Sequence, residues 1–490
     1  MARLADPGPG GRLAVLTPVL LGLWLAGTSV TGGFGPFGVY DAKRVLELVL
    51  LFMIVSLALA NPAHRHCVNG LVGALPRWTI LAFAAFLALG LASASQLQHP
   101  DYAYVEATML FMLVVAALCV AGAHHLAPVL FERITLAAIA MMVLGIIAQE
   151  SIAVLVYLAN GLQYNYRESL IYFLHPRMFN HLQTWTLPLL PLLPLVFGNT
   201  RRWRLLCIAL IAFQWFIILV TGARGSTVSL VTAMVFMAFF IRRDRGAWLR
   251  PQALGAGVGI LLFTAVYLLL NQSVDGSNKY IEESVGRPIM HTSGRLDLWE
   301  HAIDSVREDP LLGSAPMHYA CEVRHYIAAS PHNFPLQILG EWGLPAFALL
   351  ALLFLWLARG WIGWLRSGPE PPGGKSRLRD VCLSISCTAA IIHMGASGLM
   401  IAPASQVAGV LVVGWTLALA TGGRYRQPEP RALSGGMCLL TVALVCATAL
   451  LAFAWREHQS MEFRTAYAAD YGPITPRFWQ DGKTCLYDWE

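Results

Sequence analysis

The sequence predicts an all-α polytopic membrane protein, with about 12–13 transmembrane helices and one large outer loop that contains short helices. Of its 490 residues, 57% are hydrophobic and 13% are charged, whereas soluble domains carry about 25% charged residues. Long apolar stretches recur from the N-terminus almost to the end of the chain. The basic residues gather in short clusters between these stretches, which is typical of the cytoplasmic loops of membrane proteins.

The apolar stretches define candidate spans in chain order. Some are shorter than the roughly 20 residues that a helix perpendicular to the membrane needs. The first could pass for a signal peptide, but the many spans after it and the lack of a clear cleavage site favour an uncleaved helix. The predicted spans lie near residues 13–30, 45–60, 78–95, 103–122, 134–158, 183–198, 205–221, 226–241, 253–270, 337–358, 381–400, 407–420 and 434–454.

These spans divide the chain into four parts. An N-terminal transmembrane bundle of about nine helices (1–270) precedes an outer loop (271–334), C-terminal transmembrane helices (335–454) and an outer tail (455–490). With the N-terminus in the cytoplasm, basic clusters such as "NTRRWR" and "IRRDRGAWLR" fall on the inner side. The loop and the tail then lie outside, which in a bacterium is the periplasm.

Two cysteines, Cys321 and Cys485, lie in the outer parts. An oxidising compartment favours a disulfide between them, and the alternative is two free thiols that lie too far apart to meet. The formal net charge of +6 does not indicate a nucleic-acid partner, because the basic residues sit in short loops without any nucleic-acid-binding motif. The expected surroundings of the chain are membrane lipid.

An arginine turn and a polar helix start lie at the outer ends of predicted spans. Arg224 stands between two apolar runs, and the neighbouring Gly222 and Gly225 let the backbone and a ligand approach closely. Arginine in or near hydrocarbon costs roughly 2.5–3.5 kcal/mol on insertion scales, so a bound anion would explain its position. The second element, "HPRMFNHLQTWTLPLLPL", leads into a helix and carries Arg177, Asn180, His181 and Gln183.

The outer loop contains a helix that begins with a cation. In "HTSGRLDLWEHAIDSVREDP", Leu296, Trp299 and Ile303 recur at helical spacing and form one face. Arg295 lies at the N-terminal end of this helix, where free backbone N–H groups and the helix dipole favour an anion. An arginine at this place can add a bidentate grip on phosphate.

A histidine stands at the end of the outer loop. In "SPHNFPLQILGEWGLPAF", Pro331 and Pro335 are expected to hold His332 and Asn333 in an extended lead-in to the next span. His332 would then lie at the outer membrane surface, close to the depth of the lipid headgroups. Glu341 follows about two turns further along the helix.

Each of these residues also has a structural explanation. Interfacial arginines often extend to lipid headgroups without further function, and a histidine at a helix start can be an ordinary surface residue. Trp299 could serve packing alone, and Glu341 could be hydrogen-bonded within the bundle. Arginines and a histidine predicted at one depth together favour an anionic lipid headgroup, above all a diphosphate. No metal or cofactor is expected, because the sequence has no Asp-x-Asp motif, no Cys/His pairing at zinc spacing and no cofactor motif.

At these residues the sequence resembles the O-antigen ligase and polymerase superfamily, which includes bacterial protein O-oligosaccharyltransferases. The matching pieces are "FNHLQTWTLPLL", "LVTGARGSTVSL", "GRLDLWEHAIDSVREDPLLGS" and "PHNFPLQILGEWGLPA", in this order over residues 175–350. The family often shows Pro-x-x-Gly-x-Gly after the loop helix, and here Ala315 stands at the second glycine. The resemblance implies a GT-C-like membrane enzyme.

The resemblance implies transfer of a glycan from undecaprenyl diphosphate to an acceptor hydroxyl of lipid A-core or of a protein, on the periplasmic face of the bacterial inner membrane. The reaction would need no metal or cofactor and would invert the anomeric centre. Arg224 and Arg295 match arginines of the family that would grip the diphosphate, and Arg177 is a third candidate. His332 matches the family's loop histidine, the proposed base or acceptor-positioning group. The supporting residues are Asn180, His181, Gln183, Arg287, Trp299, Asn333 and Glu341.

Two alternatives to a ligase stay open at the level of the sequence. A polysaccharide polymerase of the same superfamily would use the same residues. A transporter or flippase of lipid-linked glycans would also need arginines that face a diphosphate, but its basic residues should line a path across the bilayer, and it would not need a histidine beside an outer helix. The aromatic tail could shape an acceptor site or pack as a cap on the outer loop.

Overall fold

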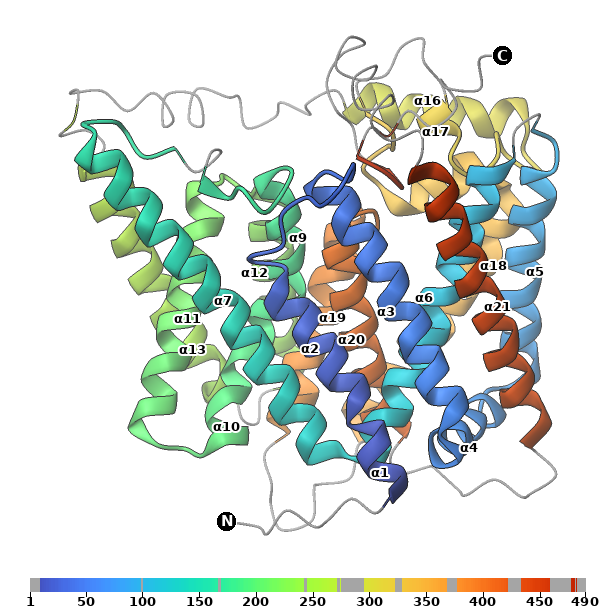
Figure 1. Ribbon diagram of the computed structural model, residues 1–490, viewed down its shortest axis with the longest axis horizontal. Helices are drawn as coiled ribbons and strands as arrows, with labels where there is room; N and C mark the ends of the chain where they lie inside the picture. The colour runs from blue at the N-terminus through green and yellow to red at the C-terminus, as the bar shows by residue number, and fades with distance from the viewer. Residues whose placement is uncertain are drawn as a thin grey trace.

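A computed structural model shows the chain as a bundle of helices that run side by side (Figure 1). Among the residues that the structure describes, the secondary structure is helical apart from one isolated bridge between Phe34 and Phe37. The predicted all-α polytopic membrane fold is confirmed. The structure describes residues 9–97, 100–165, 169–241, 245–270, 274, 295–321, 328–367, 377–421, 433–458, 477–480 and 482.

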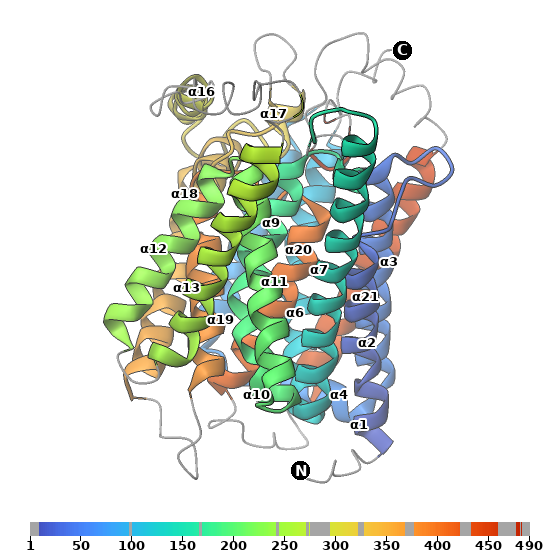
Figure 2. The same cartoon turned by 90° about the vertical axis from the view of Figure 1, so that its left-hand side faces the viewer.

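Most helices run along the bundle, while α16 and α17 lie across one of its ends (Figures 1 and 2). We call this end the loop face; α1, α4 and α10 lie at the opposite end (Figure 1). The bounds are α1 Pro9–Ala14, α2 Leu16–Gly27, α3 Val39–Ala60, α4 Pro62–Gly73, α5 Arg77–Ala94, α6 Asp101–Leu126, α7 Pro128–Ala159, α9 Pro176–Thr186, η1 Leu187–Leu192, α10 Leu193–Phe197, α11 Arg201–Val220, α12 Arg224–Phe240, α13 Arg245–Leu262, η2 Phe263–Leu270, α16 Arg295–Glu308, α17 His318–Cys321, α18 Phe334–Ser367, α19 Leu378–Met394, α20 Pro403–Thr421 and α21 Leu433–His458.

Within the described part of the chain, 8 helices are long and apolar enough to cross a membrane, or up to 9 if the bent pair α3 and α4 counts as one span. These two helices meet at an angle of 100°. The other predicted spans are helical too, but α2, α12 and α19 are shorter and the α9–η1–α10 run is broken. The number of helices that are long enough to cross a membrane is therefore lower than the 12–13 spans predicted. An apolar run in the sequence does not reveal where its helix breaks or ends.

The broken run α9–η1–α10 needs hydrogen-bond partners from its neighbours. Proline lacks an N–H group and interrupts the helical ladder, which leaves carbonyl oxygens without their usual donors. Ser386 of α19 donates to the carbonyl of Trp185 at 2.7 Å, and Gln252 of α13 donates to that of Leu187 at 3.1 Å. Such side chains make a broken helix tolerable inside a membrane protein. The prolines are Pro188, Pro191 and Pro194.

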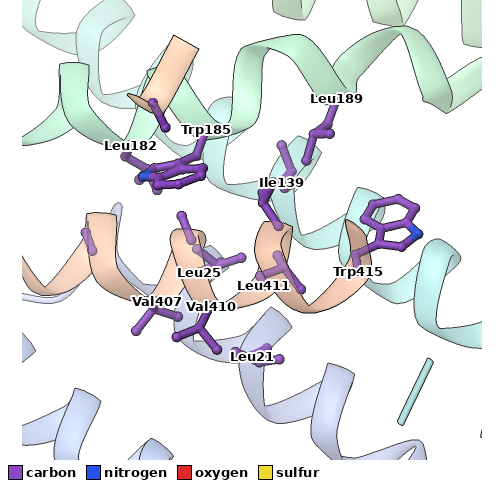
Figure 3. Close-up of a cluster of buried hydrophobic side chains, with 14 of the residues drawn as sticks. Leu21, Leu25, Ile139, Leu182, Trp185, Leu189, Val407, Val410, Leu411 and Trp415 are labelled. Atoms are coloured by element: carbon purple, nitrogen blue, oxygen red, sulfur yellow. The ribbon is translucent and has the colours of Figure 1, made fainter. Parts of the chain in front are cut away.

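Apolar packing places this run at the centre of the bundle. The close-up in Figure 3 shows side chains of α9 and η1 against those of α2, α7 and α20. Trp185 is buried there, and its indole N–H also donates to Ser405 of α20 at 3.0 Å. These contacts fix the C-terminal end of α9 inside the bundle. The labelled residues are Leu21, Leu25, Ile139, Leu182, Trp185, Leu189, Val407, Val410, Leu411 and Trp415.

A kink in α18 receives the segment that follows α16. Gly343 interrupts the helical geometry with a φ of 81°, and a Cβ there would lie 2.4 Å from the carbonyl oxygen of Leu311. The amide of Leu344 donates to the carbonyl of Pro310 at 3.0 Å. The amide of Ser314 donates to a carbonyl on the other side of the kink. Glycine at 343 is required both by its φ and by this close backbone approach, which docks the loop onto α18.

Candidate active site

The polar side chains of α9 hold the arginine turn in place. Asn180 donates to Gln183 Oε1 at 2.8 Å and to Thr221 Oγ1 at 3.1 Å. Gln183 donates to the backbone carbonyl of Gln214 on α11 at 2.9 Å. Asn180 and Gln183 are both buried. Because Thr221 lies three residues before Arg224, Asn180 and Gln183 together support the arginine turn through Thr221.

The arginine turn ends α11 and starts α12. Gly222 has a φ of 58°, a left-handed conformation that glycine adopts at no steric cost. Arg224 is the first residue of α12, and its side chain is exposed. The first backbone amides of a helix lack helical partners, and they attract anions together with the dipole. Arg224 thus adds a guanidinium to a helix end that already favours negative charge.

The segment around His332 differs from the extended lead-in that two prolines predicted. His332 has a φ of 52°, so its backbone is left-handed rather than extended. This turn lets Asn333 cap α18, because its Oδ1 accepts from the amide of Leu336 at 3.0 Å. The Nδ2 of Asn333 donates to the carbonyl of Gly395 at 3.0 Å. The helix cap and the bond to Gly395 thus outweigh the preference for an extended backbone that Pro331 and Pro335 were expected to impose on this segment.

Helix α16, which the structure describes from Arg295 onward, lies over the His332 segment. Trp299 Nε1 donates to the carbonyl of Pro331 at 3.1 Å, so Trp299 contributes a hydrogen bond as well as packing. The face that includes Leu296 and Ile303 is exposed. The buried face instead carries Leu298, Ala302 and Ser305, because α18 covers that side.

The turn after α16 keeps a glycine-like conformation without glycine. Ala315 has a φ of 79°, and Gly313 before it has a φ of 66°. Ala315 therefore occupies the left-handed region in which the family often has glycine, at a cost of roughly 1–2 kcal/mol. Ala315 is thus a non-glycine residue in a conformation that glycine adopts at no steric cost.

The electrostatic surroundings of His332 place it close to two arginines. Burial, followed by the charges of Arg295 and Arg177, lowers the pKa of His332 to about 4. Burial and the charge of Arg177 also lower the pKa of Arg295. His332 is therefore neutral at pH 7 and can accept a proton. The two arginines repel each other, and an anion between them would relieve that repulsion.

The segment 393–398, "HMGASG", joins these elements, although its sequence pattern did not predict a role in the site. Ser397 Oγ lies 2.7 Å from Nε2 of His181. A Cβ at Gly398 would lie 3.6 Å from Nδ1 of His332, so the His332 ring faces this segment. Gly395 accepts the bond from Asn333 described above. The only chemical signal was a single histidine near the end of a predicted span, which by itself does not indicate a site.

His393 connects α9 to the arginine turn. Thr184 Oγ1 donates to the carbonyl of Asn180 at 3.1 Å, so it accepts the Nδ1 proton of His393 at 2.8 Å. We infer from these bonds a tautomer with an unprotonated Nε2. A Cβ at Gly225 would lie 3.1 Å from that nitrogen. A neutral hydrogen-bond acceptor therefore lies beside Gly225, next to Arg224.

The remaining predicted residues lie elsewhere or outside the described part. Glu341 forms a buried ion pair with Arg477 in the C-terminal tail, at 2.6 Å. The amide of Tyr319 also donates to Glu341, at 3.3 Å. Its contacts are thus those of an ion-pair network. Arg287, Cys485 and the side chain of Cys321 lie outside the described residues, so the predicted disulfide stays a prediction.

A comparison with known families matches residues 206–351 to a family model described as O-antigen ligase. No curated protein matches the chain. The matched segment runs from α11 into α18 and includes Arg224, Arg295 and His332. It does not include α9 or the 393–398 segment, which the fold brings to the same place. The match over residues 206–351 supports the resemblance to the O-antigen ligase superfamily that the sequence motifs indicated.

Proposed function

We propose that the protein is an O-antigen ligase-like glycosyltransferase, which moves a glycan from undecaprenyl diphosphate to an acceptor hydroxyl. The loop face would face the periplasm of a bacterial inner membrane, with the N-terminus in the cytoplasm. The observation that carries the proposal is the neutral His332 beside two mutually repelling arginines, Arg177 and Arg295. This arrangement suits an anionic donor and a proton acceptor in one site.

The arginines would stabilise the leaving group. In the reaction, the acceptor oxygen forms a bond to the anomeric carbon while the bond from that carbon to the diphosphate breaks. The bonding electron pair leaves with the diphosphate, whose charge increases. Arg295, Arg177 and Arg224 at the start of α12 would stabilise this charge without a metal. A single displacement of this kind inverts the anomeric centre.

His332 would take the proton of the acceptor hydroxyl. In the unliganded protein its pKa is about 4, which makes it a weak base. A bound diphosphate would neutralise the charges of Arg295 and Arg177, so the pKa of His332 would rise on donor binding. The base would therefore strengthen when the donor is in place, where proton transfer is useful.

The acceptor separates the members of the superfamily. We favour lipid A-core or a protein hydroxyl, and a second lipid-linked glycan would make the protein a polymerase. The experiment is a reaction of purified protein with undecaprenyl-diphosphate glycan and each of three acceptors: lipid A-core, a second lipid-linked glycan, or a pilin-like peptide. Release of undecaprenyl diphosphate that depends on one acceptor supports the proposal and identifies the member type. Donor movement across proteoliposomes, with no release for any acceptor, would instead support a transporter.

A further inference from the structure

A second arginine network lies beside the candidate active site. Arg477, in the C-terminal tail, is buried, with its side chain 3% exposed. Its Nη2 contacts Glu106 of α6 at 2.8 Å and Glu341 of α18 at 2.6 Å. Its Nη1 donates to the carbonyl of Ala329 at 2.8 Å. One guanidinium thus joins the tail, two helices and the backbone that leads to His332.

The tail segment 477–480 is itself seated on the bundle. The hydroxyl oxygen of Tyr40 on α3 lies 2.7 Å from the carbonyl oxygen of Arg477. The amide of Gln480 donates to Asp41 at 2.6 Å, and the Trp479 side chain is fully buried. These contacts hold the backbone of the segment, so Arg477 reaches Ala329 from a fixed base.

The backbone at His332 is held in an unfavourable conformation. Pro331 accepts a hydrogen bond from Trp299 of α16, and the amide of His332 lies 3.4 Å from Ser330 Oγ. His332 is a left-handed non-glycine residue, with a φ of 52°, and such a strained conformation persists only where its surroundings fix it. The buried guanidinium of Arg477 fixes this backbone through its hydrogen bond to Ala329, three residues before His332.

We propose that Arg477 is a positioning residue for the transfer reaction, which holds Ala329 and Glu341 and so fixes the backbone that presents His332. The inference rests on the proposed role of His332 in glycan transfer. It makes the tail segment 477–480 part of the framework of the candidate active site. A 1 Å misplacement of reacting groups can cost about 10²-fold in rate, so loss of the anchor should reduce turnover more than donor binding.

The test is Arg477→Lys in the full-length protein. Lysine keeps a positive charge between Glu106 and Glu341, but its compact ammonium lacks the second arm of the guanidinium that reaches Ala329. We expect kcat for release of undecaprenyl diphosphate to fall about 10²-fold, and the donor Kd to stay within about twofold. Hydrogen exchange of the amides in 328–333 should speed up, while that of α20 stays unchanged.

The matched control is Arg456→Lys. Arg456 pairs with Asp101 at 2.8 Å, but its side chain is 58% exposed, so neither activity nor exchange should change. Wild-type kcat in Arg477→Lys would overturn the proposal. Faster exchange throughout the bundle would also overturn it, because the role of Arg477 would then be general stability. If the wild type releases no undecaprenyl diphosphate, the proposed function fails, while exchange in 328–333 still decides whether Arg477 positions this segment.

Discussion

Two arginines near the His332 segment have opposite electrostatic surroundings. Burial by itself would lower the pKa of Arg477, but Glu106 and Glu341 outweigh burial and raise it above its ordinary value. Burial and the neighbouring Arg177 both lower the pKa of Arg295. The first cation is satisfied within the protein, whereas the second lies beside a like charge.

The difference separates an arginine that holds structure from one that is suited to a ligand. A cation paired with two carboxylates gains little from a further anion, and removing a partner leaves a buried charge uncompensated. A cation beside another cation carries unfavourable free energy that a bound anion would release. Mutual repulsion at Arg177 and Arg295 therefore marks the place where we expect the diphosphate, and not the network around Arg477.

The largest effect is expected at the proton acceptor. His332→Ala should reduce transfer by about 10²–10⁴-fold, because a general base contributes that much to rate. Donor affinity should change little, since the arginines that would bind the diphosphate remain. Release of undecaprenyl diphosphate under saturating donor measures the rate of transfer, and a direct binding titration measures the donor affinity. Loss of donor binding in His332→Ala would show that His332 is a lipid-contacting or structural residue instead.

The next effect concerns the arginines themselves. Arg224→Lys keeps the charge but removes the planar fork, and Arg295→Gln removes the charge, so each should lower kcat by about 10²–10³-fold. The control is Arg307→Gln on the last turn of α16, where Arg307 pairs with Asp304 on the surface at 2.7 Å. That change should leave kcat unaltered. Full activity in Arg224→Lys, at wild-type protein levels, would argue against a diphosphate at the arginine turn.

The pH dependence of kcat/KM reports on the same surroundings in the free enzyme. Because His332 must be neutral to act as a base and its pKa is lowered to about 4, activity should hold from neutral pH to about pH 5 and fall through about pH 4. Arg295→Gln removes one charge that lowers this pKa, so the fall should move to higher pH, toward 6.5. An acid limb near 6.5 in both proteins would contradict the proposed role of Arg295 beside His332.

The smallest effects concern stability and have opposite signs in the two regions. Glu341→Gln weakens the pairing of Arg477 and should lower the free energy of unfolding by about 1.5–3 kcal/mol. Arg295→Gln removes a cation that lies beside Arg177. The free energy of unfolding should therefore rise by about 0.5–2 kcal/mol when no donor is bound. Thermal denaturation in detergent compares the two variants. A lower Tm in Arg295→Gln would mean that Arg295 is paired as Arg477 is.

The sequence predicted the helical framework because long apolar runs have a single physical explanation in a membrane protein. Each predicted span coincides with helical residues. The helix breaks were harder to predict. In the run that contains Pro188 and Pro191, side chains from α13 and α19 donate hydrogen bonds to backbone carbonyls. Such partners come from tertiary packing and leave no periodic signal.

The candidate site was predictable only where side-chain chemistry and the family pattern coincided. Arg224, Arg295 and His332 stood out as polar residues beside apolar runs. His393 did not, because its contacts with Thr184 and Gly225 arise from the packing of α19 against α9 and α12. Nor could the sequence indicate the partners of Glu341, because Arg477 lies 136 residues away along the chain.

The most direct measurement is the affinity of a short isoprenyl diphosphate for three forms of the purified protein: wild type, Arg295→Gln and Arg477→Lys. If the repelling arginines form the donor site, Arg295→Gln should bind at least about tenfold more weakly than the wild type, the loss of one charge-assisted hydrogen bond. Arg477→Lys should bind as the wild type does. Equal affinity in wild type and Arg295→Gln, or a loss confined to Arg477→Lys, would place the diphosphate elsewhere and contradict the proposed site.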